Sequence, residues 1–133
     1  MTRLALAIAL AASAAAADAP GIRVVDGDTI HVTLPPARGE PAQIVKHRLA
    51  DLDTPEAGWR ALCLAERWLA DHATARVRAL IAAADRIEFR WTGRVGRYGR
   101  PITEVWIDGV SLADTLKAER LAQGWPKNRG WCE

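Results

Sequence analysis

The sequence is poor in the residues that build zinc sites. Its 133 residues include two cysteines and three histidines. No Cys or His stands at ligand spacing from another, which argues against a structural or catalytic zinc ion. We therefore expect His31, His47 and His72 to be surface or core residues rather than metal ligands.

Long apolar runs are also missing, except at the N-terminus. There "MTR" is followed by "LALAIALAASAAAA", which has fourteen residues. A helix that spans a bilayer needs about 20 residues, so a membrane span is the weaker interpretation. A short positive start, an apolar run and small residues at 15–17 are typical of a secretory signal peptide. We predict a signal peptide at 1–17 and one domain at 18–133, without a membrane anchor, secreted or periplasmic.

A strong excess of positive charge is absent as well. Arg3 is the one charged residue in 1–17, so the rest of the chain holds 17 Lys and Arg against 16 Asp and Glu, a net charge of +1. Proteins that grip nucleic acid over a broad surface are much more basic. Positive charge for such a partner must therefore be local, and Arg94, Arg97 and Arg100 fall within seven residues.

The two cysteines, Cys63 and Cys132, admit two interpretations. In an exported protein they meet an oxidising compartment, which favours a single disulfide. Closing a loop of roughly 70 residues stabilises the fold by about 4 kcal/mol in the chain-entropy model. The alternative is a pair of reduced, buried thiols. We predict the disulfide.

Short alternating segments predict five strands, at 22–25, 29–34, 43–52, 86–91 and 100–107. Asp-Gly turn signals follow the first and the last of them. Between the third and fourth strands an amphipathic helix is expected at 61–83, with an apolar face formed by Leu62, Ala65, Leu69, Ala73, Val77 and Leu80. A second helix begins after the cap Ser111 and runs to about residue 122. We see no internal repeat and no linker.

This order of elements predicts the fold class. Five short strands with a helix between the third and fourth favour a small closed sheet over an open parallel one. We expect an α+β, mainly β protein: a five-stranded OB-fold barrel with two to three helices.

Three motifs carry the chemistry: "DGDT" at 26–29, "DTPE" at 53–56 and "GRVGRYGR" at 93–100. Each has a structural alternative, namely a tight turn, a helix start and a solvated glycine-rich loop. Together they offer oxygen ligands for a hard cation and arginines for a phosphodiester. A further carboxylate can take a proton from water. Nuclease chemistry needs these residue types together.

In order along the chain, "VVDGDTI", "RLADLDTPE", "RYGRPITEVWIDG" and "LADTLKAERLA" resemble segments of the thermonuclease family, the staphylococcal-nuclease-like domains. The resemblance covers about residues 22–122. It implies the OB-type barrel and hydrolysis of DNA and RNA that leaves 3′-phosphates. It also implies Ca²⁺ as the cofactor, while the residues themselves equally allow Mg²⁺ or Mn²⁺.

The resemblance assigns roles by position. Asp28 and Asp53 match the two metal carboxylates, and Thr54 matches the residue that offers its backbone carbonyl to the metal.

Three further positions match catalytic residues. Glu56 corresponds to the glutamate usually assigned as general base. Arg48 and Arg100 correspond to the arginines that grip the scissile phosphate. Beside them, Tyr98 and Arg97 are predicted substrate contacts.

The chain departs from the family pattern in four places. Asp51 stands where a small or apolar residue is common, and we expect it to be a solvated carboxylate or to adjust the metal site. The segment between 28 and 48 is longer, and Arg120 replaces the glycine that often ends the second helix. The tail lacks the tyrosines that cover the base. Trp125 and Trp131 could stack on a base instead, but we expect both to pack structurally.

One geometric condition must be met. Strict strand alternation puts Arg48 and Asp53 on opposite faces of a strand. For both to reach one phosphate, the strand must end or bulge between them. The Thr-Pro that follows makes an ending near Leu52 reasonable.

Three functions are compatible with these patterns. The first is a secreted, monomeric, metal-dependent nuclease. The second is an inactive OB-fold module that binds nucleic acid or another anionic polymer, and the third is a disulfide-fixed structural domain of the cell envelope. We favour the nuclease because all six functional positions that the resemblance matches carry the expected residue types.

Overall fold

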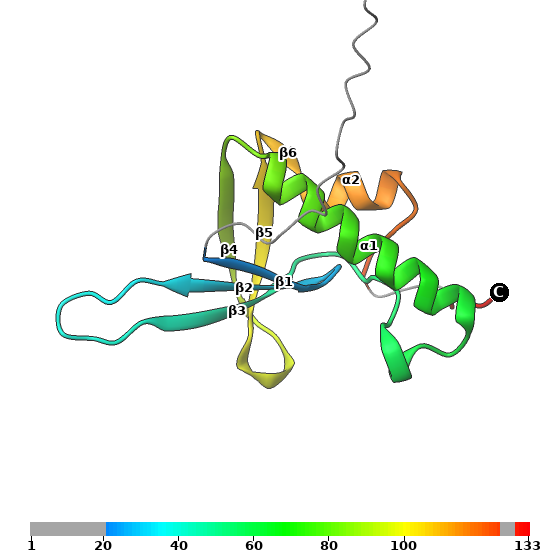
Figure 1. The fold of residues 1–133 in the computed structure, drawn as a ribbon, viewed down its shortest axis with the longest axis horizontal. Helices are drawn as coiled ribbons and strands as arrows, with labels where there is room; N and C mark the ends of the chain where they lie inside the picture. The colour runs from blue at the N-terminus through cyan, green and yellow to red at the C-terminus, as the bar shows by residue number, and fades with distance from the viewer. Residues whose placement is uncertain (1–20, 126–129) are drawn as a thin grey trace, which may run out of the picture.

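A curled sheet forms the framework of the molecule (Figure 1). The computed structural model describes residues 21–125 and 130–133, so the predicted signal peptide lies outside the described residues. The strand order is β1-β2-β3-β5-β4, and a short strand β6 pairs with β5. The bounds are β1 Ile22–Asp26, β2 Thr29–Leu34, β3 Gln43–Leu49, β4 Ile87–Val95, β5 Pro101–Ile107 and β6 Val110–Ser111. This mainly β, α+β half-barrel confirms the predicted OB-type fold class.

A parallel pair, β3 and β5, joins the two antiparallel parts of the sheet. β2 pairs with β1 and β3 antiparallel, and β4 pairs with β5 antiparallel. β3 and β5 run parallel, with Arg48 opposite Ile102 and Leu49 opposite Thr103. The end of β3 therefore lies beside the beginning of β5. Residues that follow β3 and residues that precede β5 meet at this place, although about fifty positions of sequence separate them.

Helix α1, Leu64–Ala83, lies across the sheet and packs against β1 (Figure 1). It begins three residues later than predicted because Cys63 is its N-cap and accepts a hydrogen bond from the Glu66 N–H. Its buried face also differs from the prediction. Leu62 is exposed, and the buried residues are Glu66, Ala70, Ala73, Val77 and Ile81.

The core fills the space between the sheet and the two helices. The large fully buried side chains include Val24, Ile30, Leu52, Val77, Leu112 and Leu116. Each such side chain contributes about 1.5–3 kcal/mol by leaving water. Leu112 and Leu116 come from α2, Leu112–Ala118, which is capped by Ser111 as predicted but ends four residues early.

Helix α2 is capped at its C-terminal end although Arg120 stands in place of a glycine. Arg120 itself adopts a positive φ of 60°. Its N–H bonds to the Lys117 carbonyl, and the Leu121 N–H bonds to the Leu116 carbonyl. This is the paired pattern that usually ends on glycine. The arginine keeps the glycine conformation, at the steric cost that a side chain brings there.

Several tryptophans are exposed to solvent rather than packed in the core. Trp59 is 87% exposed, and Trp125 is 63% exposed. The expectation that Trp125 packs structurally is therefore wrong, whereas Trp131 is half-buried.

The predicted disulfide is confirmed. Cys63 and Cys132 are bonded, with a sequence separation of 69 residues. The bond ties the N-cap of α1 to the last described residues, which lie at the same end of the helix in Figure 1. Among the described residues, no helix combines the length and apolar character needed to cross a bilayer.

Removing this cross-link should destabilise the fold. We expect Cys63→Ser with Cys132→Ser to lower the free energy of unfolding by about 4 kcal/mol, because the unfolded chain regains the entropy of a long open loop. Urea titration monitored by circular dichroism measures the change. Reductant should bring the wild type to the same midpoint and leave the double variant unaffected. A loss below about 1 kcal/mol would contradict the entropic account.

Candidate active site

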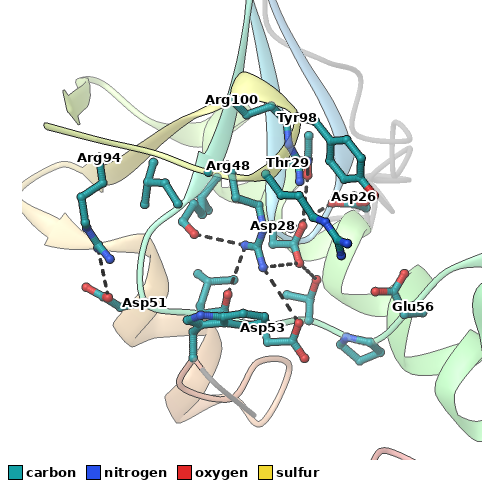
Figure 2. A pocket seen from close by; sticks show the side chains of 18 of the residues that line it. Asp26, Asp28, Thr29, Arg48, Asp51, Asp53, Glu56, Arg94, Tyr98 and Arg100 are labelled. Atoms are coloured by element: carbon teal, nitrogen blue, oxygen red, sulfur yellow. Dashed lines mark hydrogen bonds and ion pairs between the residues drawn. The ribbon is translucent and has the colours of Figure 1, made fainter. Parts of the chain in front are cut away.

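One pocket of about 530 Å³ opens where β3 ends and β5 begins (Figure 2). All the predicted site residues line it: Asp28, Arg48, Asp53, Thr54, Glu56, Arg97, Tyr98 and Arg100. The pocket therefore meets the condition that these side chains surround one space. It establishes their proximity, while the role of each residue stays a prediction.

Arg48 lies at the centre of the pocket. Its Nη2 is 3.4 Å from Asp28 Oδ2 and 3.9 Å from Asp53 Oδ1. Its Nη1 donates to the backbone carbonyls of Leu49 and Leu52, both at 3.1 Å. Figure 2 shows these contacts converging on one guanidinium. Since the Arg48 and Asp28 side chains are only 16% and 14% exposed, the charges are largely removed from water and depend on each other for compensation.

The chain bends sharply between Arg48 and Asp53, which is how both reach the pocket. β3 ends at Leu49, three residues before the predicted ending. Asp51 then takes a positive φ of 59°, a conformation that Asp tolerates better than most residues. Asp53 resumes pairing and exchanges two 2.8 Å backbone hydrogen bonds with Gln123. Strand alternation stops at the turn, so the geometric condition is met.

Asp28 is fixed by its own turn. Its N–H donates to Asp26 Oδ1 at 3.1 Å, and its carboxylate accepts from the hydroxyls of Thr29 and Thr54 at 3.0 and 3.1 Å. Thr54 was predicted to act through its backbone carbonyl, and the structure gives its side chain this additional contact. The carboxylate is thus oriented before any ligand arrives.

Gly27 allows this turn to approach the neighbouring loop closely. A Cβ at this position would lie 2.7 Å from Thr54 Cγ2 and 3.1 Å from Ala73 Cβ. Its φ is not in the left-handed region, so glycine is required here because no room is left for a side chain and not because of its backbone conformation. It lets Asp28 and Thr54 meet over α1.

Asp26 was read from the sequence as part of a turn, but it also lines the pocket. Burial, followed by the nearby charge of Asp28, raises the pKa of Asp26 to about 6. At neutral pH two carboxylates therefore lie close together, a like-charge arrangement that a bound cation relieves.

Arg100 approaches the same carboxylate through a hydroxyl. Its Nη1 donates to Thr29 Oγ1 at 3.3 Å, and that hydroxyl donates to Asp28. Its Nε is buried without a hydrogen-bond partner among the described residues. The guanidinium is held in place by few protein contacts, which leaves donors for an anionic ligand.

The loop before β5 supplies the two predicted substrate contacts. Tyr98 is 82% exposed and has a positive φ of 68°. The guanidinium carbons of Arg97 and Arg100 each lie 5.8 Å from its ring centre. A hydrogen bond from the Gly96 N–H to the Arg100 carbonyl closes the loop. The tyrosine ring therefore contacts two cations at the pocket rim.

Glu56 lies on the rim, with no drawn contact to Asp28 or Asp53 (Figure 2). Partial burial and the charges of Asp28 and Asp53 raise the pKa of Glu56. The alternative interpretation of "DTPE" as a helix start is wrong, since the next α-helix begins at Leu64.

The donor set of the pocket suits a hard cation. Asp28 and Asp53 present carboxylate oxygens, and none of the described lining residues is a Cys or a His. No group of three or more Asp, Glu, His or Cys side chains in 21–125 and 130–133 is close enough to form a complete metal site. Ca²⁺ or Mg²⁺ held by Asp28 and Asp53 would complete its coordination with backbone, water or substrate oxygens.

Trp125, Arg60 and Arg94 also line the pocket, and of these only Arg60 was not singled out in the sequence. Trp125 lies at the rim, with the Arg48 guanidinium 5.9 Å from its ring centre. Arg94 forms an exposed ion pair with Asp51 at 3.5 Å. Such a pair contributes little to stability. Arg60 had no local signal beyond its residue type.

Comparison with known proteins gives one informative match. No family model matches the chain. The chain is 33% identical over 102 residues to the SPbeta prophage-derived endonuclease YokF of Bacillus subtilis (strain 168). The matched stretch is 76% of this chain and 32% of that protein, so the chain spans about a third of its relative's length. The similarity covers most of the described fold.

A methyl group at position 27 should disturb the site. We expect Gly27→Ala to lower the free energy of unfolding by about 1–3 kcal/mol through overpacking against Thr54. Gly124→Ala is the matched control, because a Cβ there meets nothing within 4 Å, and it should change stability by less than about 0.5 kcal/mol. Adding Thr54→Ser to Gly27→Ala removes the closest methyl and should restore part of the loss. Equal stability of the two alanine variants would refute the steric role.

The pKa of Asp26 predicts a pH dependence of stability. Because its folded value of about 6 lies above the ordinary 3.8, the folded state binds this proton more tightly. The resulting stabilisation is complete below the ordinary pKa and is lost as pH rises through 6. Asp26→Asn keeps an acceptor for the Asp28 N–H but does not titrate.

Urea titrations in chelator-treated buffer test this expectation. Relative to wild type, the free energy of unfolding of Asp26→Asn should rise between about pH 4 and about pH 7. A constant difference across that range would show that burial does not raise the pKa of Asp26.

Proposed function

We propose that this chain is a secreted or periplasmic, divalent-metal-dependent nuclease that hydrolyses phosphodiester bonds of DNA and RNA and leaves 3′-phosphates. The observation that supports it best is the convergence of Asp28, Asp53, Arg48, Arg100 and Glu56 on one pocket. The name of the Bacillus relative, an endonuclease, points to the same chemistry. Ca²⁺ is the proposed cofactor, on the family resemblance.

The arginines bind and orient the phosphate in this proposal. A divalent cation held by Asp28 and Asp53 would neutralise phosphate oxygens as negative charge grows during attack. Arg48 is anchored by two backbone carbonyls, and Arg100 by Thr29. The two guanidinium groups are thus held in place for the charge on the five-coordinate phosphorus.

Glu56 acts as general base. Its raised pKa makes its carboxylate a stronger base than that of an ordinary glutamate. It takes a proton from a water molecule whose oxygen forms the new bond to phosphorus. The bond from phosphorus to the 5′ oxygen breaks, and that oxygen leaves with a proton from solvent. The position of Glu56 on the rim, apart from the Arg48 contacts, leaves space for water and phosphate.

The disulfide supports the proposed location. Stable disulfides form in oxidising compartments, outside the reducing cytosol. We further propose that the protein acts as a monomer, since all the matched catalytic positions come from one chain.

Incubation with denatured DNA and Ca²⁺, followed by addition of a chelator, tests the reaction. Cleavage that stops on chelation and yields 3′-phosphate ends supports the proposal. Retardation of DNA in a gel without cleavage would instead favour the inactive binding module. Absence of both would leave a structural domain.

Two substitutions should remove activity without unfolding the protein. We expect Arg100→Ala and Glu56→Ala each to lower kcat/KM by about 100-fold or more, through loss of transition-state charge stabilisation and of the base. Arg76→Ala is the control, because Arg76 forms an exposed ion pair with Glu119 outside the pocket. Wild-type rates in either folded pocket variant would show that its role is misassigned.

A further inference from the structure

Glu66 is a buried carboxylate that the proposed reaction does not use. It lies in the first turn of α1 and is only 2% exposed. Burying a carboxylate is costly unless hydrogen bonds compensate it. The partners of Glu66 therefore indicate what the residue does.

Its two oxygens hold both ends of one loop. Oε1 accepts from the Glu56 N–H at 3.1 Å, and Oε2 accepts from the Leu62 N–H at 2.7 Å. Hydrogen bonds from N–H groups to a carboxylate are among the stronger ones in proteins. The loop that they close begins at the proposed general base.

Packing does little to hold the same loop. Residues 56–60 are all exposed, and Trp59 and Leu62 are 87% and 85% exposed. A single 3₁₀ turn, Gly58–Arg60, is its regular structure. With so little apolar burial in 56–60, the two hydrogen bonds to Glu66 are the contacts that tie both ends of this loop to α1.

The anchor itself is rigid. The Glu66 N–H donates to Sγ of Cys63 at 3.4 Å, and Cys63 is bonded to Cys132. The carboxylate thus projects from a capped helix end that a covalent bond restrains.

We propose that Glu66 is a positioning residue for Glu56: by binding the N–H groups at both ends of the 56–62 loop, its carboxylate sets the place of the Glu56 side chain on the pocket rim. This inference rests on the proposed nuclease function. It adds to that function a residue that touches neither phosphate nor metal.

Glu66→Gln tests the proposal with little change in shape. Glutamine offers one carbonyl oxygen, so one loop N–H then faces an amide NH₂ and loses its bond. We expect kcat to fall about 10- to 100-fold, because a small displacement of a catalytic group is costly. KM and the Ca²⁺ affinity should stay within about twofold of wild type, since substrate and metal contact other residues. Asp71→Asn, an exposed carboxylate-to-amide change on the same helix, should leave kcat unchanged.

A double-mutant cycle separates positioning from a general loss of structure. In a Glu56→Ala background, Glu66→Gln should have almost no further effect on the residual rate, because the positioned group is gone. An undiminished loss in that background overturns the proposal, as does wild-type kcat in the single variant.

A second variant guards against misfolding of the first. Leu62→Pro removes one donor and leaves Glu66 intact, and Ala61, with ψ of 136°, already has the extended conformation that precedes proline. It should lower kcat in the same direction, by a smaller factor. Unchanged kcat in folded Leu62→Pro counts against the tether.

Amide hydrogen exchange tests whether Glu66 holds the loop, and it does so without an activity assay. The Glu56 and Leu62 amides should be protected in the wild type, and at least one of them should exchange at least about 10-fold faster in Glu66→Gln, while amides in the middle of α1 remain unchanged. If both amides exchange at the same rate in Glu66→Gln as in the wild type, the inference is overturned even if the enzyme is active. A wild-type protein that cleaves nothing overturns the proposed function and the catalytic half of this inference, and the exchange rates still decide whether Glu66 holds the loop.

Discussion

The contact between the Arg48 guanidinium and the carboxylates of Asp28 and Asp53 is the interaction on which the pocket depends. Two acidic groups that are 14% and 10% exposed repel each other strongly unless a positive charge lies between them. Arg48 provides that charge and is fixed by the carbonyls of Leu49, the last residue of its strand, and of Leu52 in the turn that follows. The same guanidinium therefore stabilises the fold of the turn and prepares a place for a cation and an anion.

The parallel pairing of β3 and β5 supplies the second constraint. It places Arg48 of β3 beside the start of β5, which Arg100 directly precedes, and the Thr29 hydroxyl links Arg100 to Asp28. Asp28 lies in the turn between β1 and β2, Arg100 directly precedes β5, and Arg48 lies one residue before the end of β3. The rigid sheet thus determines the distances between the site residues, while the short loops determine the directions in which their side chains point.

Much of this arrangement could be predicted from the sequence, because turns and caps carry local signals. Asp-Gly at 26–27 and Ser111 before α2 correctly predicted a turn and a helix start. The predicted start of α1 was wrong because Cys63, not an earlier residue, caps the helix, and the capping sulfur belongs to a disulfide. Glu66 is buried by a loop closed over it, and no periodicity reveals a carboxylate whose partners are backbone groups. The position of Trp125 at the pocket depends on the path of the tail, and that path is determined only by tertiary contacts.

The order of assembly follows from where the partners lie along the chain. Asp53 pairs with Gln123, and Cys63 is joined to Cys132. A nascent polypeptide that has emerged only as far as β5 therefore lacks the strand partner of one acidic residue and the covalent brace of the loop that bears the base. Both become available late in translation, and the brace also requires an oxidant. If the chain is an exported nuclease, as proposed, this covalent brace forms only after the polypeptide has left the reducing cytosol.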